Sequence, residues 1–547
     1  MIPFSEHLVI MPILLPLISG AVLMFIADRQ RVLKAMVSLF ATLGLAAVAL
    51  MLVADQAGES ASRVYMLGNW LAPFGIVLVL DKLSALMVAL TAVLAVPVLV
   101  FSLARWHSAG AHFHSLFQFL LVGVNGAFLT GDLFNLFVFF EVMLAASYGL
   151  LLHGSGALRV KAGLHYIAVN LAAALLFLIG VSLIYGTAGT LNMADLAARI
   201  PAIEPDRRML MEAGAGVLGV AFLIKAGMWP LCFWLPAAYS VAAAPVAAIF
   251  AIMSKVGIYV ILRLSVLLFA EGPSAEFGSD VLVYGGLATI AFGTIGVLAS
   301  QALGRIGAYC VLVSSGTLLT VIGLEDAAAT SSALYYLVSS TLTLGAFFML
   351  VELVERCQDA GANVLAVTME AYGDADDEIA EEGEGVTMPS TLAILGTCFA
   401  ASAILLSGLP PLSGFVAKFA LLSAIIGTGS IGVPPTGSGL WFAALVILAG
   451  LATLIALTRA GIRTFWSSIE GRVPRVLVME VVPVMMLLAV MAGLTIKAGP
   501  ALAYMEETIR AIDKSKAYIE AVGEATPVPS WRDQKPQDQM PQDQGGD

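Results

Sequence analysis

The chain has 547 residues, of which 60% are hydrophobic and only 12% charged, and its formal net charge is −11. Soluble domains carry about 25% charged residues, so this composition excludes an ordinary soluble protein and predicts a polytopic, all-α membrane protein. None of the four cysteines forms a Cys-x-x-Cys pair, so the usual zinc and iron–sulfur ligand sets are missing. We therefore expect no metal, no cofactor and no nucleic-acid partner.

Apolar stretches of about 20 residues, each long enough to cross a bilayer, follow one another along almost the whole chain. They lie at 8–27, 35–54, 77–103, 114–131, 133–152, 163–186, 211–235, 241–269, 281–300, 305–324, 331–354, 391–428, 439–466 and 476–497. About 14 transmembrane helices are thus predicted. The first stretch follows an acidic start and has no small-residue cleavage site, so we interpret it as a retained helix, not a signal peptide.

Basic residues in alternate loops predict the orientation of these helices, because cytoplasmic loops are enriched in lysine and arginine. One set of loops carries Arg29, Arg31, Lys34, Arg105, Arg159, Lys161, Arg305, Arg459, Arg463, Arg472 and Arg475. The opposite set carries only Arg63, Arg199, Arg207 and Arg208, among acidic residues. The first set is predicted to be cytoplasmic, which places both termini outside.

Two of the apolar segments contain helix-breaking residues beside a lysine. In the seventh, Lys225 precedes Gly227 and Pro230; in the twelfth, Lys418 follows the stretch 407–414, which reads Ser-Gly-Leu-Pro-Pro-Leu-Ser-Gly. A charged residue at membrane depth costs about 2.5–3.5 kcal/mol on insertion scales. A broken helix is tolerated there where its free backbone groups line protein or water. Both features indicate a polar cavity.

The positions of the two broken helices, 7 and 12, predict an internal repeat. They are five positions apart in the order of the helices, and because this offset is odd the two segments cross the membrane in opposite directions. That arrangement is typical of inverted-topology repeats in transporters. The predicted organisation is residues 1–110 for helices 1–3, 111–270 for a first inverted five-helix repeat, 271–470 for a second, 471–523 for helix 14 and an interfacial helix, and 524–547 for a disordered tail.

Four ionisable residues lie well inside predicted spans: Glu141, Lys225, Lys255 and Lys418. Glu141 and Lys225 could form a static ion pair, and either remaining lysine could extend its ammonium to an interface. Three lysines and one glutamate cannot all be neutralised pairwise, however. Burial disfavours the ammonium form, so lysines near a movable carboxylate are suited to carry protons. We predict a proton relay of these four residues.

Other residues give weaker indications of a role in function. Hydroxyls that could hold a water wire are Ser254, Ser314, Ser315, Thr317, Ser339, Ser340, Thr341 and Thr343, although each could simply bond its own helix. Asp132 is interpreted as a helix cap. The loop with His107, His112 and His114 is interpreted as interfacial, with a metal site as the less favoured alternative. The acidic segment 359–388 is expected to be a mobile cytoplasmic loop, or alternatively a surface that docks a partner.

Four stretches of sequence together resemble a known family: Gly131 to Glu141, Phe222 to Gly227, Lys255 to Tyr259, and Gly408 to Lys418. They are similar to the antiporter-like membrane subunits of respiratory complex I and of Mrp-type cation/proton antiporters, over roughly residues 8–497. Within that family the chain most resembles the D-type Mrp subunits.

The resemblance implies a role for the chain in the bacterial inner membrane. It implies a proton-translocating subunit of a multisubunit Na⁺ or K⁺/proton antiporter, with the Mrp subunits of types A, B, C, E, F and G as partners. It also implies that Glu141 pairs with Lys225, that Lys255 links two half-channels, and that Lys418 is the terminal proton carrier. A transporter component rather than an enzyme is therefore expected.

The chain departs from the family in its eleventh helix. Many members have a histidine and often a lysine there, whereas residues 335–345 of this chain offer only hydroxyls. The relay between Lys255 and Lys418 would then depend on water and hydroxyl groups. Two other functions stay open: a proton-pumping subunit of a complex I-type or hydrogenase redox complex, and a structural scaffold, which would leave the buried lysines unexplained.

Overall fold

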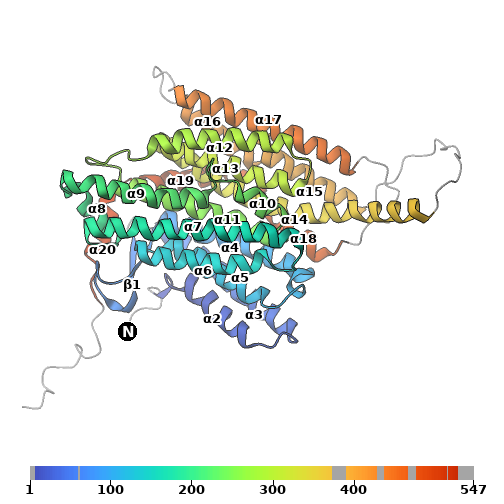
Figure 1. Cartoon of the computed structure of the whole chain (residues 1–547), viewed down its shortest axis with the longest axis horizontal. Coiled ribbons are helices and arrows are strands. Elements are labelled where there is room, and N and C mark those ends of the chain that lie inside the picture. The colour runs from blue at the N-terminus through green and yellow to red at the C-terminus, as the bar shows by residue number, and fades with distance from the viewer. Residues whose placement is uncertain are drawn as a thin grey trace, which may run out of the picture.

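The computed structural model describes residues 7–58, 62–371, 390–427, 437–465, 476–513 and 515–527. Figure 1 shows a bundle of long, roughly parallel helices, with α2 and α3 on one flank and α16 and α17 on the other. Eleven helices in the described part of the chain are long and apolar enough to cross a membrane, and four shorter apolar helices accompany them. The predicted multi-pass helical membrane fold is confirmed, with one small β-hairpin besides the helices. The total of fourteen spans and the inverted repeats stay predictions.

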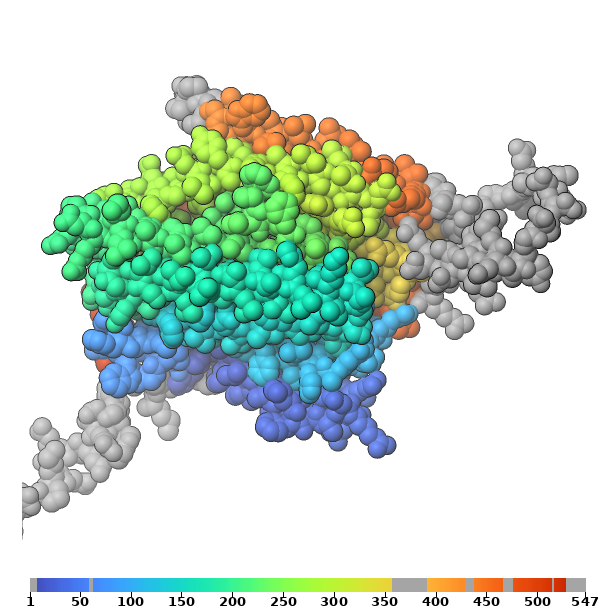
Figure 2. Space-filling model, viewed as in Figure 1, coloured from blue at the N-terminus to red at the C-terminus, as the bar shows by residue number. Residues whose placement is uncertain are grey.

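The first half of the chain forms one flank and the centre of the bundle, and Figure 2 shows the same order in its surface colours. Its helices are α2 (Met11–Phe25), α3 (Arg31–Gly58), α4 (Lys82–Ala104), α5 (Phe113–Leu129), α6 (Leu133–Leu151), α7 (Ala157–Ala188), α8 (Met193–Arg199), α9 (Pro205–Ala226), α10 (Trp234–Val241) and α11 (Ala244–Leu268). Short 3₁₀ turns lie at Leu67–Asn69, Trp106–Ser108 and Ile200–Ala202.

The second half completes the bundle. Its helices are α12 (Ser279–Ala299), α13 (Leu303–Leu324), α14 (Ala327–Ala371), α15 (Ser390–Ser407), α16 (Ser413–Ile426), α17 (Gly437–Phe465), α18 (Val478–Ile496), α19 (Ala498–Ile512) and α20 (Ser515–Gly523). The last two are short and amphipathic, and α19 buries Met505, Ile509 and Ile512 against the bundle.

Between α3 and α4 the chain forms a small hairpin. Strand β1 (Arg63–Met66) pairs antiparallel with β2 (Val77–Leu80), with Arg63 opposite Leu80 and Met66 opposite Val77. All four residues of β2 are buried, and the strand leads directly into the cap of α4 at Asp81. The sequence pattern alone did not indicate this hairpin, because Val77–Leu80 reads equally well as the start of the third apolar stretch.

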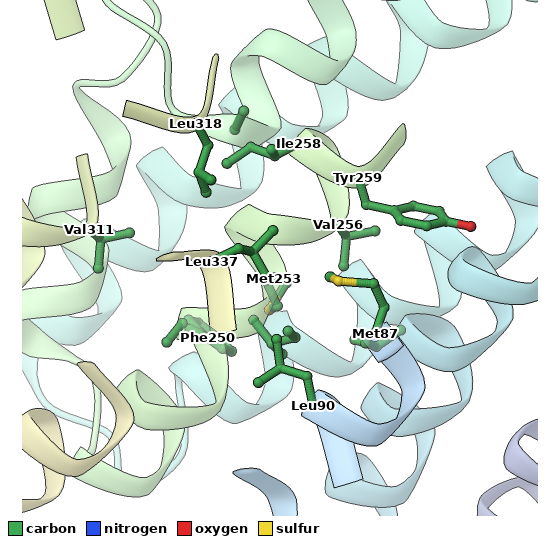
Figure 3. Packing of buried hydrophobic residues seen from close by; sticks show 14 of the residues in the cluster. Met87, Leu90, Phe250, Met253, Val256, Ile258, Tyr259, Val311, Leu318 and Leu337 are labelled. Atoms are coloured by element: carbon green, nitrogen blue, oxygen red, sulfur yellow. The ribbon is translucent and has the colours of Figure 1, made fainter. Parts of the chain in front are cut away.

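Helix α11 occupies the centre of the bundle. All residues of its most apolar 18-residue stretch are buried, whereas only 28% of the residues in the corresponding stretches of α3 and α18 are buried. Figure 3 shows its side chains Phe250, Met253, Val256, Ile258 and Tyr259 among residues of neighbouring helices. Because α11 is surrounded by protein rather than lipid, a polar residue on it meets other side chains. Lys255 lies on this helix and is completely buried.

One expectation needs correction. The acidic segment 359–388 was predicted to be a loop throughout, but α14 continues to Ala371 and projects beyond the neighbouring helices. Residues 359–371 are rich in alanine, valine, leucine and methionine, and several of these are strong helix formers, so the helix continues from the membrane span. Residues 372–389 and the predicted disordered tail beyond residue 527 lie outside the described residues.

Candidate functional site

The first broken segment consists of α9 and α10. Helix α9 ends at Ala226 because Gly227 adopts a left-handed conformation with φ +75°, the usual cap of a helix C-terminus. The backbone groups at the break have partners: the Ile224 carbonyl accepts from the Gly227 N–H at 3.2 Å and from the Trp234 indole N–H at 3.1 Å. Trp229 N–H donates to Thr289 Oγ1 at 2.8 Å. The predicted break is therefore present and its backbone is satisfied within the protein.

Lys225 lies in the last turn of α9 and is 7% exposed. Its ammonium donates to Oδ1 of Asn170 on α7, at 2.6 Å. Glu141 on α6 is half-buried and lies within electrostatic reach of Lys225, yet the described structure contains no ion pair of 4 Å or less between the two. The two residues implied to pair are thus brought to one region, with the amide of Asn170 as the direct partner of the lysine.

A glycine lets the helices of Lys225 and Lys255 approach closely. A Cβ atom at Gly257 on α11 would lie 3.0 Å from Ala226 N and from Phe222 O on α9, and 3.2 Å from Cβ of Lys225. Such contacts are too short for a larger residue without a shift of the helices. The close approach therefore brings the backbone of α11 against the last turn of α9, whereas Lys255, two residues before Gly257, points to another side of α11.

Lys255 begins a chain of hydroxyl groups that crosses to the second half of the bundle. Its ammonium donates to Ser314 Oγ on α13 at 2.8 Å, and Ser314 Oγ lies 3.0 Å from Ser340 Oγ on α14. The neighbouring Ser339 is hydrogen-bonded to Ser413 at 3.0 Å, at the start of α16. Helix α14 thus carries hydroxyls toward both lysine sites, in the stretch where the family that the sequence resembles often has histidine.

A cavity of about 30 Å³ lies between these hydroxyls and Lys418. Its lining includes Ser314, Ser339, Ser340, Gly414 and Lys418. A water molecule needs about 10–15 Å³ of such volume and two to four polar partners, so the cavity has room for one or two waters with suitable partners. Waters there would bridge the gap between Ser340 and the Lys418 ammonium.

The second broken segment consists of α15 and α16, and Lys418 lies on α16. Helix α15 ends at Ser407, and Gly408 adopts φ +77°. The Lys418 ammonium donates to the carbonyl oxygens of Leu406 at 3.1 Å and Ser407 at 2.9 Å. These carbonyls lack helical partners at the end of α15, and the helix dipole is negative there. Lys418 therefore closes the helix end that the break opens.

The remaining candidates divide clearly. The hydroxyls of Ser254, Thr317, Thr341 and Thr343 each donate to a carbonyl of their own helix, and Ser315 Oγ is buried without a hydrogen-bond partner. Asp132 caps α6 by accepting from Asn135 N–H at 2.8 Å, as expected. No group of three or more histidine, cysteine, aspartate or glutamate side chains within the described residues is arranged to hold a metal.

Two buried charge clusters were not predicted from the sequence. Arg263 at the end of α11 pairs with both carboxylate oxygens of Asp81, which caps α4. Burial alone would raise the pKa of Asp81, but the Arg263 guanidinium outweighs that effect and holds this pKa below its usual value. Arg263 lies inside the predicted span 241–269, so the signal was available in the sequence.

The second cluster lies at the opposite end of the bundle, near the start of α18. Glu480 is 1% exposed and pairs with Arg105 at 3.1 Å and Arg356 at 2.9 Å. Glu352 accepts from the indole N–H of Trp106 at 2.7 Å and contacts Arg356 at 3.3 Å. Because removing one member would leave a buried charge unpaired, this cluster locks α14, α18 and the α4–α5 connection together.

Comparisons with known proteins decide the family. Residues 130–442 match the family model described as NADH:quinone oxidoreductase/Mrp antiporter, TM. The chain is 60% identical to a probable D-type K⁺/H⁺ antiporter subunit of Rhizobium meliloti, over 93% of this chain and 96% of that protein. The chain belongs to the family of D-type antiporter subunits. It is also 35% identical to a D-type Na⁺/H⁺ antiporter subunit of Alkalihalophilus pseudofirmus, over 94% of this chain and 99% of that protein.

A solved structure supports the same assignment. A chain in the structure of the Mrp complex from Dietzia sp. is 26% identical, with a TM-score of 0.80, and the match covers 95% of this chain and 100% of that one. The family members named above are antiporter subunits, so a transporter component and not a catalytic enzyme is confirmed for this D-type chain. The resemblance predicted from four sequence stretches is likewise confirmed.

Proposed function

We propose that this chain is the proton-translocating D-type subunit of a multisubunit monovalent cation/proton antiporter in a bacterial inner membrane. Its partners are then the other Mrp-type subunits, of types A, B, C, E, F and G. The observation that carries the proposal is the series of polar contacts from Lys255 through Ser314 and Ser340 to the cavity beside Lys418. Lys225 lies on α9, which packs closely against the helix of Lys255, and the chain is 60% identical to a probable K⁺/H⁺ antiporter subunit.

In the proposed relay, Lys225 and Glu141 form the first site. When the two approach, the carboxylate stabilises the ammonium form of the lysine. When they separate, this stabilisation is lost and the lysine releases its proton more readily. Lys255 receives the proton at the centre of the bundle and passes it to Ser314 and Ser340. A hydroxyl is both a donor and an acceptor, so it can accept a proton from one neighbour while it releases its own proton to the next.

Lys418 forms the last site of the relay. Waters in the adjoining cavity would connect Ser340 to the Lys418 ammonium. In its protonated form Lys418 bonds the two carbonyls at the end of α15. Loss of the proton would weaken those bonds and allow water to replace them, which couples the charge of Lys418 to the shape of the second break.

The transported cation is proposed to be potassium in preference to sodium. The support is the higher identity to the protein named as a probable K⁺/H⁺ antiporter subunit, 60%, than to the one named for Na⁺/H⁺, 35%.

The redox-driven alternative, a pump subunit of a complex I-type assembly, is less well supported, because both of these relatives are named as antiporter subunits. Neighbouring genes for six small membrane proteins would favour the antiporter, and genes for quinone and iron–sulfur subunits the pump.

The test measures cation-dependent proton movement in everted vesicles that contain the whole complex. Lys225→Ala is expected to reduce exchange by about 100-fold or more, the usual contribution of a proton-transfer group, while native gels show an assembled complex. Lys161→Ala, in the predicted cytoplasmic part of α7, is the matched control. Exchange near the wild-type rate in Lys225→Ala would overturn the relay, and a response to sodium but not potassium would overturn the cation assignment.

A further inference from the structure

Asn170 on α7 holds the Lys225 ammonium in this structure and has no part in the relay proposed above. It is 1% exposed, in the middle of a helix rather than at its end. Its Oδ1 accepts from Lys225 at 2.6 Å, and its Nδ2 donates to the carbonyl of Tyr166 at 2.7 Å. An ammonium only donates, so the lysine can meet this amide only through its oxygen. The bond to Tyr166 fixes the amide in that orientation.

The residue beneath Asn170 is itself anchored. Tyr166 is 2% exposed, and its hydroxyl lies 2.8 Å from Ser147 Oγ on α6, the helix that carries Glu141. The Tyr166 ring packs against Trp234 and Phe250, with centroids 5.3 and 6.1 Å away. Asn170 is therefore a rigid acceptor, held by a network that joins α6 and α7.

An aromatic cluster joins the three helices that carry Glu141, Asn170 and Lys225. Phe140, Phe177 and Phe222 come from α6, α7 and α9, and their ring centroids lie 5.2 to 6.0 Å apart. Phe140 adjoins Glu141, and Phe222 lies one turn before Lys225. These apolar rings offer no hydrogen-bond acceptor beside the two charged residues.

We propose that Asn170 is a positioning residue whose amide oxygen competes with the Glu141 carboxylate for the Lys225 ammonium and holds the pair open. This inference rests on the proposed function. The amide satisfies the ammonium without a negative charge, so a lysine held there gives up its proton more readily than one held by a carboxylate. Movement of the lysine between the two acceptors would then decide when the first site retains its proton and when it releases it.

Two substitutions separate positioning from packing. Asn170→Asp keeps the shape of the side chain but adds a carboxylate. The ammonium form of Lys225 is then favoured both beside residue 170 and beside Glu141. Release of the proton requires a more alkaline pH, so the pH profile of exchange should move up by about one to three pH units. Asn170→Leu removes the competing acceptor and should lower exchange about 10-fold or more, because Lys225 stays with Glu141. Both are measured in everted vesicles across a pH range and normalised to the assembled complex on native gels.

The matched control is Asn125→Leu. Asn125 is a buried asparagine on α5 that donates to the Pro12 carbonyl on α2 at 3.1 Å. Its substitution removes a buried amide without touching Lys225, so the pH profile of exchange should match the wild type. A shift in the control equal to that in Asn170→Asp would mean that loss of a buried amide, not positioning of the lysine, causes the effect.

Lys225→Ala in the same experiment distinguishes this inference from the proposed function. If Lys225→Ala keeps wild-type exchange, the relay itself is wrong. If Lys225→Ala is inactive while both Asn170 variants show the wild-type rate and pH profile, the relay stands and only the role of Asn170 is overturned. Should Asn170→Leu fail to assemble, the isosteric Asn170→Asp decides, since an unchanged pH profile in that variant contradicts the inference by itself.

Discussion

The two broken helices differ in what their lysines do. Each break begins with a left-handed glycine, Gly227 or Gly408, and each lies in a segment that carries one lysine. At the first break, the Ile224 carbonyl accepts from the Trp234 indole and from the Gly227 N–H, and Lys225 bonds the side chain of Asn170. At the second break, Lys418 itself bonds the free carbonyls of α15.

This difference assigns different tasks to two residues that look alike in the sequence. A lysine bound to a neutral side chain can exchange that partner for a nearby carboxylate while the helix end keeps its own cap. A lysine that caps a helix end cannot change its charge without changing the bonding of the break. The first site is therefore suited to electrostatic switching, and the second to coupling of protonation with backbone structure. Substitutions at three residues and the replacement of one segment test this contrast.

The largest effect is expected for Lys418. Lys418→Arg should lower exchange about 100-fold, close to the effect of Lys418→Ala, because arginine stays protonated above pH 12 and cannot pass a proton on. Everted vesicles report the rate, and Lys497→Arg beyond α18 serves as the control. Near-normal exchange by the arginine variant, with none by alanine, would leave Lys418 as a purely electrostatic cap.

Glu141→Gln should reduce exchange about 10-fold to 100-fold, because it removes the negative charge beside Lys225. An opposite charge within about 4–6 Å can shift the pKa of a neighbouring group by about one to three units. Glu141→Asp should keep part of the activity, since the charge remains on a shorter side chain. Exchange is measured against pH, with Glu271→Gln as a control in the α11–α12 connection. Equal loss of exchange in both Glu141 variants would show that the length of the side chain matters to the Glu141–Lys225 interaction as much as its charge.

Trp234→Phe tests the cap that leaves Lys225 free. Removing the indole N–H takes away one of the two donors to the Ile224 carbonyl and leaves the Gly227 N–H in place, so the cost is about 0.5–1.5 kcal/mol. The adjacent ammonium can then turn to that oxygen. We expect a moderate loss of exchange, about 3-fold to 10-fold. Trp441→Phe, on an exposed face of α17, is the matched control. An unchanged rate in Trp234→Phe would show that the indole does not determine the position of Lys225.

The smallest effect is expected for the acidic segment that precedes α15. Replacing residues 372–389 with a short neutral linker leaves both breaks intact, and segments with few apolar residues contribute little to a fold, so exchange should change less than about 2-fold. The control keeps the segment length but neutralises its acids. Loss of the assembled complex on native gels would instead identify the segment as a docking surface for another protein of the complex.

Much of this organisation was predictable from the sequence. Helix ranges follow from apolar runs of sufficient length, and the two breaks follow from glycine and proline beside Lys225 and Lys418, because these effects are local to a few residues. Glu141 and Lys255 stand out because a charge inside an apolar run is costly and therefore rare. Their roles in proton transfer stay predictions until the variants above are measured.

Composition and local sequence patterns were enough to predict the membrane fold, the family, the helix breaks and the ionisable residues within the spans. Which groups those residues contact follows from the packing of the helices. Asn170 lies 55 positions from Lys225, and Ser314 lies 59 positions from Lys255, so only the packing of separate helices brings them into contact. A close approach at Gly257 and the carbonyls freed at the end of α15 depend on the same packing, which apolar periodicity does not encode.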